Sequence, residues 1–317
     1  MGGYKFGKGV PTWNGMPMVG GAIFTTGSSF FVSSGIGSDG NRGTSPDKPF
    51  ATINKAVSAC TASKADVIYC MPGHGESIGD TSTSGAMDLD VAGITLVGLG
   101  TGSLQPKITF AHADADFIVG ASDVTITGMH FFAAITGVKL GVAIETLNTG
   151  TTISNCKFSV EETTVDEFLI AINLTVGCDG TIIKDNIIDM GLGGATDGVA
   201  LVGASADIRI ENNEIIGDYS LGNITAITTL STEVKILNNL LVNGGSGNLS
   251  DQPVIDFITN CTGVCADNYM CTNVATDLAS INSADLLLYT NNYYNNTAGV
   301  GKVGGKYSAT VVASIDE

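Results

Sequence analysis

Seven copies of a short motif recur along this chain at intervals of 24 to 30 residues. Each copy alternates apolar and polar residues and ends in two turn-forming residues, which in five copies are Asn-Asn or Asp-Asn. The sixth position of the motif falls at residues 129, 156, 186, 213, 239, 268 and 292. A repeat of this length is typical of solenoids, in which one repeat buries its apolar face only by stacking on its neighbours. The 317 residues therefore predict one elongated domain rather than two globular ones.

The motif also predicts the local structure of each repeat. Its first residues form a short strand in which alternate side chains point inward. The Asn or Asp at the fifth position turns the chain, because these residues tolerate the left-handed region. The asparagine at the sixth position then points into the corner and stacks on its counterpart in the next coil. Strands of successive coils pair in parallel about 4.8 Å apart, so that residues 65–300 hold roughly nine coils in a rod of about 40 to 45 Å.

These repeats resemble those of right-handed parallel β-helix proteins of the pectate-lyase-like superfamily. Three upstream segments share the resemblance: residues 37–57 look like the entry sequence, Asp66–His74 like the first coil and Ile94–Gly100 like the second. It covers about residues 31–300 and implies an all-β, right-handed parallel β-helix. Bacteriophage virion proteins with this fold, such as spikes, fibres and capsid decorations, are the most similar in character. Lyases, hydrolases and adhesins share the fold, so the resemblance specifies architecture rather than activity.

Four regions follow from this reading: residues 1–30, 31–64, 65–300 and 301–317. The first is expected to be an extended arm that anchors the protein on a partner, with Tyr4, Phe6 and Trp13 as its contacts. The second holds an apolar stripe at Ile53, Ala56, Val57 and Cys60, which predicts a short helix covering the open end of the solenoid. The third is the β-helix. The last is a C-terminal tail or cap.

Composition excludes several classes of partner. A formal charge of −17 argues against nucleic acid and anionic lipid, and against a polyanionic glycan unless cations intervene. No apolar run reaches the roughly 20 residues that span a bilayer, so membrane insertion is not expected. The N-terminal region lacks the features of a secretory signal, which predicts synthesis in a cytoplasm. The seven cysteines form no CxxC pair and are expected to be reduced, buried thiols rather than zinc ligands.

Candidate catalytic or metal-binding residues are few. His112, Asp114 and Asp116 would share one face of a strand, where they could hold a divalent cation or act as an acid and a base; otherwise they form a polar loop. Other acidic groups could approach one another or simply be solvated: Glu161, Glu162, Asp166, Glu167, Asp189, Glu214 and Asp218. A lyase would need a basic residue, and Arg42 and Arg209 lie in an entry loop and on the surface. His74 is expected to be a turn residue. We assign no catalytic residue, metal or cofactor from the sequence.

In each repeat, the residue directly after the sixth motif position and the residue two before it are expected to face solvent. In the C-terminal half they gather apolar side chains at Leu237, Leu240, Tyr269 and Tyr293. An exposed patch of this kind typically marks a subunit interface, and tyrosine suits such a contact. Two alternatives remain: a platform on which sugar rings stack, and a phase one residue different, which would bury these side chains.

These features favour a non-enzymatic structural protein of a tailed-phage virion: a capsid decoration, head fibre or spike. Its arm would dock on the capsid or tail, and its β-helix would project or associate laterally, most simply as a homotrimer. A host-surface glycan is a further candidate partner. The alternative function is a tailspike-like depolymerase that cleaves a neutral glycan with Asp/Glu pairs. A third is an adhesin exported without a cleavable signal.

Overall fold

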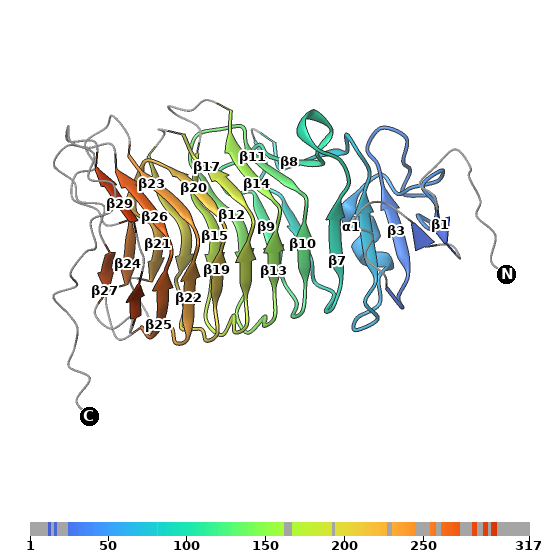
Figure 1. The fold of residues 1–317 in the computed structure, drawn as a ribbon. Coiled ribbons are helices and arrows are strands. Elements are labelled where there is room, and N and C mark those ends of the chain that lie inside the picture. Colours follow the sequence, from blue (N-terminus) through green and yellow to red (C-terminus); the bar gives the residue numbers. More distant parts are fainter. Residues whose placement is uncertain are drawn as a thin grey trace.

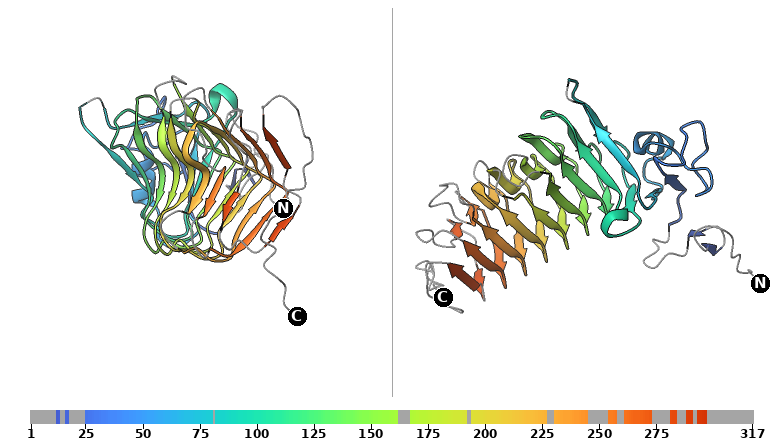
Figure 2. Two further views of the ribbon diagram at one scale, coloured as in Figure 1. Left: turned by 90° about the vertical axis from the view of Figure 1, so that its left-hand side faces the viewer. Right: turned by 90° about the horizontal axis from the view of Figure 1, so that it is seen from above.

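The chain folds into a solenoid of parallel strands, whose strands stack in sequence order from β3 to β29 (Figure 1). The computed structural model describes residues 25–80, 82–161, 167–191, 194–226, 230–244, 254–257 and 261–272, together with the backbone of short strands at 12–13, 16–17, 281–283, 288–290 and 293–296. Seen from above, successive strands lie side by side along the solenoid (Figure 2, right). The all-β parallel solenoid predicted from the repeat is thus confirmed.

Three sheets run the length of the solenoid, with ten, nine and eight strands. The ten-strand sheet comprises β3 (Ser29–Val32), β4 (Val67–Cys70), β7 (Thr95–Gly98), β10 (Thr125–Thr127), β13 (Thr152–Ser154), β16 (Ile182–Lys184), β19 (Arg209–Glu211), β22 (Val234–Leu237), β25 (Gly263–Ala266) and β28 (Leu288–Thr290). The nine-strand sheet comprises β5 (Gly75–Ile78), β8 (Lys107–Phe110), β11 (His130–Ala133), β14 (Lys157–Val160), β17 (Ile187–Asp189), β20 (Glu214–Gly217), β23 (Leu240–Asn243), β26 (Tyr269–Thr272) and β29 (Tyr293–Asn296). The eight-strand sheet comprises β6 (Ala86–Asp88), β9 (Asp116–Val119), β12 (Val138–Ile144), β15 (Phe168–Leu174), β18 (Ala195–Leu201), β21 (Tyr219–Ala226), β24 (Ile255–Phe257) and β27 (Ile281–Ser283).

Each turn of the solenoid contributes one strand to each sheet. Six turns in succession, from β4 to β21, have all three strands. The solenoid continues beyond β21 through strands that lie among partly described residues, so the expected total of roughly nine coils stays a prediction. The short strands β1 (Thr12–Trp13) and β2 (Met16–Pro17) pair with each other antiparallel.

The corner between the ten-strand and nine-strand sheets holds the predicted asparagine ladder. Asn186, Asn213, Asn239 and Asn268 are buried, and the Oδ1 atom of each accepts the backbone N–H of its counterpart one turn earlier at 2.9 to 3.1 Å. Their Nδ2 groups donate to backbone carbonyls of the preceding turn, at 2.9 to 3.0 Å. The preceding residue has a φ of +52° to +59° at residues 155, 185, 212, 238 and 267. Both motif positions therefore act as the sequence predicted.

A second ladder, which the sequence analysis did not predict, lies at the corner where each turn leaves the eight-strand sheet. The Ser205 hydroxyl accepts the N–H of Cys178 at 3.0 Å, and the Ser231 hydroxyl accepts the N–H of Ser205 at 3.4 Å. The N–H of Ser231 in turn donates to the sulfur of Cys261 at 3.4 Å. Small side chains with weakly polar heads satisfy buried backbone donors at this corner. Among the described residues all seven cysteines are free thiols, and five of them are buried.

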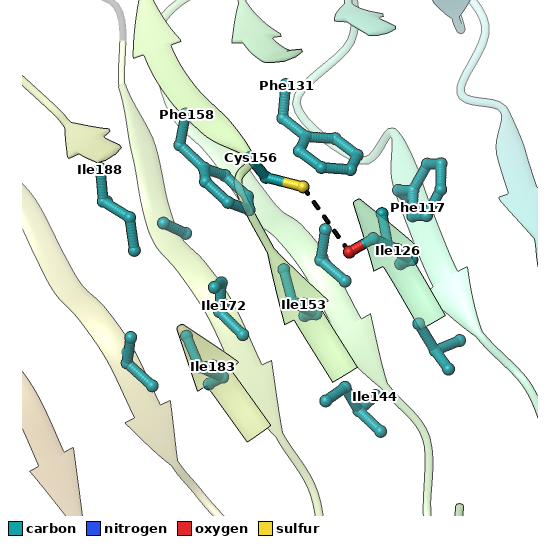
Figure 3. Close-up of a cluster of buried hydrophobic side chains, with 14 of the residues drawn as sticks. Phe117, Ile126, Phe131, Ile144, Ile153, Cys156, Phe158, Ile172, Ile183 and Ile188 are labelled. Atoms are coloured by element: carbon teal, nitrogen blue, oxygen red, sulfur yellow. Dashed lines mark hydrogen bonds between the residues drawn. The ribbon is translucent and has the colours of Figure 1, made fainter. Parts of the chain in front are cut away.

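The interior is packed by columns of identical or similar apolar side chains (Figure 3). Phe131 stacks on Phe158 with ring centroids 4.8 Å apart, and Phe117 meets Phe131 edge-on at 5.0 Å. In the next column Ile126, Ile153 and Ile183 pair in register. All these side chains are fully buried. Each turn therefore buries its apolar face against the turns above and below it.

The N-terminal end carries a short helix, α1 (Ile53–Ala59), which packs against β3 and β4. Thr52 caps it by accepting the N–H of Lys55 at 3.2 Å, and Ile53, Ala56 and Val57 are buried. The strand β3 crosses the predicted boundary between arm and entry segment; it pairs in parallel with β4 and is the first strand of the ten-strand sheet. A 3₁₀ turn, η1 (Gly102–Leu104), precedes β8.

Most of the predicted arm at residues 1–30 lies outside the described residues, including Tyr4 and Phe6. Trp13 is described only as backbone within β1. The predicted tail at 301–317 also lies outside the described residues. The arm, its anchoring role and the capping role of α1 therefore stay predictions.

Candidate functional site

The outer face of the nine-strand sheet carries a column of side chains in strict register. Successive strands align Lys107, His130, Lys157, Ile187, Glu214, Leu240, Tyr269 and Tyr293. Ile187, Leu240 and Tyr269 are 47%, 41% and 57% exposed, respectively. The sequence placed Leu240 and Tyr269 on an outward face, and both lie there. We call Ile187, Leu240 and Tyr269 the apolar strip.

The other two residues of the predicted interface lie differently. Leu237 ends β22 in the neighbouring ten-strand sheet, where it is half-buried. Tyr293 begins β29 and pairs with Tyr269, but its side chain lies outside the described residues. Whether this surface binds a subunit or a sugar is not decided by its geometry, and both assignments stay predictions.

The same column is basic at its N-terminal end. Lys107, His130 and Lys157 occupy adjacent strands and are all half-buried. The Nε2 atom of His130 lies 2.7 Å from the hydroxyl of Ser159, and the Lys107 ammonium lies 4.6 Å from the centre of the Phe132 ring. Burial, together with the charges of Lys157 and Lys107, lowers the pKa of His130 to about 4, so the imidazole is neutral at pH 7. We call Lys107, His130, Lys157 and Ser159 the basic cluster.

The outer face of the eight-strand sheet holds a buried polar group that the sequence analysis missed. Residues 172, 199, 224 and 255 pair in register and point into the core, so Asn173, Thr225 and Asp256 alternate to the outer side. Asp197 accepts a hydrogen bond of 2.6 Å from the Thr225 hydroxyl, so it lies on that side as well. All four side chains are buried although they face outward.

Burial dominates the electrostatics of Asp197. Burial, with a smaller contribution from the charge of Asp256, raises the pKa of this carboxyl to about 6 against the opposing hydrogen bond from Thr225. A carboxyl with this pKa exchanges its proton near neutral pH, as a general acid or base must. The available signal in the sequence was an aspartate inside the otherwise apolar strand 195–201. The pairing of β18 with β21 is irregular between Ala195 and Asp197, and Asp197 lies outward although Val199 points into the core, so strand periodicity did not reveal which way Asp197 points.

The predicted cluster at residues 112–116 is not brought together on a strand. Residues 112–115 form a turn, in which the Nδ1 atom of His112 accepts the N–H of Asp114 at 3.0 Å. Asp114 is exposed and pairs with Lys139, which lowers the pKa of the carboxyl. Only Asp116 belongs to a strand, β9. His112 and Asp114 stay close, with 3.9 Å between Nδ1 and the carboxylate, but they lie in a turn. The strand alternative was therefore wrong, and the polar loop is the arrangement observed.

The other acidic candidates do not converge in one place. Asp189 ends β17 and Glu214 begins the next strand, β20, both on the outer face, whereas Asp218 is buried between β20 and β21. Glu161 is exposed and Glu167 is buried, and residues 162–166 lie outside the described residues.

His74 is explained by the fold. It is fully buried, its Nδ1 atom accepts the N–H of Ser34 at 2.9 Å, and its Nε2 atom lies 3.1 Å from Glu76. Glu76 also accepts the N–H of Ile53 at the start of α1, at 3.0 Å. This turn histidine therefore ties the entry segment to the first turns of the solenoid.

Within the described part of the chain, no three His, Cys, Asp or Glu residues are grouped so that they could hold a metal ion. Nor does that part contain a helix long and apolar enough to span a membrane. Arg209 is on the surface, 3.8 Å from Asp207.

Comparison with solved structures identifies the fold. The crystal structure of pectate lyase Pel9A aligns with a TM-score of 0.55 at 13% identity, covering 79% of this chain. The chain spans 65% of that lyase, less than two thirds of its length. A rhamnogalacturonan lyase aligns at a TM-score of 0.39 with 12% identity, over 88% of this chain and 90% of that one. A GH136 lacto-N-biosidase from Eubacterium ramulus aligns at 0.41 with 11% identity, over 84% of this chain and 67% of that one.

No family model matches the sequence, and no curated protein matches it. The structural likeness and the solenoid topology together show a pectate-lyase-like parallel β-helix fold. At this level of identity they show the fold alone.

Proposed function

We propose that this protein is a non-enzymatic structural rod of a tailed-phage virion, a spike, fibre or capsid decoration, which associates laterally through its nine-strand sheet. The observation that carries the proposal is the apolar strip: three large apolar side chains exposed in one outward column that the core does not need. Glu214 lies between Ile187 and Leu240, whereas Leu240 and Tyr269 are direct neighbours. Exposed apolar side chains gathered on one face mark an interface, and tyrosine is enriched at interfaces. A homotrimer of parallel rods and an N-terminal arm that docks on capsid or tail complete the proposed arrangement.

Light scattering after size-exclusion chromatography tests the lateral contact. We expect a mass near three times 32.4 kDa for the full chain, and the same oligomer number after removal of residues 1–30. The double variant Leu240→Glu/Tyr269→Glu should be monomeric, because it sets charges against one another across the contact. Leu104→Glu, an equally exposed apolar position elsewhere, is the matched control and should remain oligomeric. A monomeric wild-type protein would refute the contact.

The virion assignment has a separate test. Tryptic peptides of this chain should be found in purified, DNase-treated phage particles from the source organism, at a stoichiometry that survives high-salt washing. Their presence only in the cell envelope of uninfected cells would instead support an exported adhesin.

A second candidate function is hydrolysis of a neutral glycan, as in a tailspike-like depolymerase. It is favoured by one observation: the pKa of Asp197 is raised to about 6 on an outward face that also carries Asp256. Glycosidases pair a protonated carboxyl with an ionised one about 5 to 10 Å away. Reducing-end release from capsular and lipopolysaccharide glycans should then be abolished by Asp197→Asn and kept by Asp189→Asn, an exposed control. Equal activity in wild type and Asp197→Asn would exclude this role.

A further inference from the structure

The basic cluster is unusual for a chain of this charge. The sequence has 31 acidic and 14 basic residues, yet two lysines and a histidine stand in one column. Neighbouring strands of a sheet lie about 4.8 Å apart, so these three groups are held close together by the register of the solenoid. They come from three different repeats, and stacking of the repeats brings them onto one surface.

No carboxylate neutralises this column in the described part of the chain. The lysine and arginine ion pairs there join Lys139 to Asp114, and both Arg209 and Lys235 to Asp207, whereas neither Lys107 nor Lys157 has a carboxylate oxygen within 4.0 Å. Like charges on adjacent strands destabilise a sheet. Burial is the main cause of the lowered pKa of His130, and the charges of Lys157 and Lys107 act in the same direction, as expected for this repulsion. A bound anion would relieve it.

The donors of the cluster are also partly fixed in position. The hydrogen bond of 2.7 Å between Ser159 and His130 joins side chains from two neighbouring strands, β14 and β11. Lys107 rests over the Phe132 ring, which restricts the lysine side chain to the sheet surface. Fixed donors lower the entropy lost when a ligand binds. The two ammonium groups suit a compact oxyanion, and the His130–Ser159 pair adds one further donor: the Ser159 hydroxyl where Nε2–H donates to it, or the Nδ1–H of His130 where the hydroxyl donates to Nε2.

We propose that Lys107, His130, Lys157 and Ser159 form a binding site for a compact oxyanion: the phosphate, sulfate or carboxylate group of a small molecule or of a sugar. The site is separate from the apolar strip and from Asp197, and it depends on neither proposed function. It also qualifies the argument from net charge, which excludes extended polyanions but not a single anionic group at a local basic site.

The test is a titration with inorganic phosphate, followed by NMR of the His130 imidazole and by calorimetry at pH 7.5. Saturable binding is expected, with a Kd on the order of millimolar, and the His130 resonances should shift with the same Kd. Lys157→Ala and Lys107→Ala should each weaken binding about tenfold, because each removes a charge-assisted hydrogen bond. Lys184→Ala removes a lysine from the neighbouring ten-strand sheet and serves as the matched control, with an expected change below about twofold.

Two results would overturn the proposal. One is the absence of saturable binding in the wild type up to 50-fold above the expected Kd. The other is an equal loss in Lys184→Ala and Lys157→Ala, which would mean unspecific charge screening. Thermal unfolding of each variant establishes that it is folded. Ser159→Ala tests the site without changing its charge, because both lysines stay in place.

Parallel titrations with glucuronate and glucose identify the source of the anionic group. Binding of glucuronate but not glucose supports a sugar-borne carboxylate, whereas binding of phosphate alone supports a free phosphate or phosphate ester. Binding of glucose as tightly as glucuronate would contradict an oxyanion site.

Discussion

The two halves of the nine-strand sheet have similar interiors and different exteriors. Inward, the column stays apolar throughout: Ile108, Phe131, Phe158, Ile188, Ile215, Leu241 and Met270. Outward, β8, β11 and β14 present the basic cluster, whereas β17, β23 and β26 present the apolar strip, which Glu214 of β20 interrupts. Stacking constrains the inner column, because every turn must bury it. It leaves the outer column free, so a change of chemistry along that column indicates different contacts for the two halves.

The largest effect should come from breaking the inner column. Phe158→Ala should lower the free energy of unfolding by about 3 to 5 kcal/mol, because it leaves a cavity beside Phe131 and Phe168. Phe132→Ala, on the outer face of β11, is the matched control and should cost about 1 kcal/mol or less. Urea denaturation measures both. Equal losses would contradict the division between an inner and an outer column.

The ladder should come next. Asn213→Ala removes the acceptor for the N–H and Nδ2 groups of Asn186 and the donor to Asn239. Buried donors without acceptors should lower the free energy of unfolding by about 2 to 4 kcal/mol. Glu211→Ala, two residues away on the surface of β19, should change it by less than about 0.5 kcal/mol. A loss below about 1 kcal/mol in Asn213→Ala would show that the ladder is dispensable.

A smaller effect of opposite sign is expected at Asp197. Its pKa is about 6 in the folded chain and about 3.8 unfolded, so the charged form is disfavoured by folding. Wild-type stability should therefore fall as pH rises from 3.8 to 6 and stay lowered above that. Asp197→Asn keeps an acceptor for Thr225 and should be about 1 to 2 kcal/mol more stable than wild type at pH 7.5, with no gain at pH 3.5. Thermal unfolding at the two pH values checks this.

The smallest effect concerns His130. Its pKa of about 4 lies below the unfolded value of 6.5, so its contribution to stability is complete above pH 6.5 and is lost as pH falls toward 4. Lys157→Ala removes one of the charges that lower this pKa, so NMR titration should place it higher, by a few tenths of a unit or more. Lys184→Ala should leave it unchanged. An unshifted pKa in Lys157→Ala would mean that burial alone sets the value.

Much of the fold was predictable because repetition amplifies a weak local pattern. The phase of the motif gave the ladder asparagines and the outward positions of Leu240 and Tyr269, since each prediction drew on several repeats. Features that belong to a single repeat were not predictable. The turn at His112 broke an assumed strand, and the irregular pairing beside Asp197 hid its direction.

The basic cluster was missed for a different reason. His130 and Lys157 each follow the sixth position of a repeat and so face outward by its phase, but Lys107 lies one repeat before the first recognised copy. Net charge averages over the whole chain and cannot show that three basic groups share a column. The Ser/Cys ladder was missed because its members, Cys178, Ser205, Ser231 and Cys261, are not identical.

Light scattering on two double variants tests the central claim, that the two halves of the outer face make different contacts. We expect Leu240→Glu/Tyr269→Glu to fall to 32.4 kDa, and Lys107→Ala/Lys157→Ala to keep the mass of the wild-type oligomer. A monomeric wild type, or the same mass for both double variants, would contradict the account.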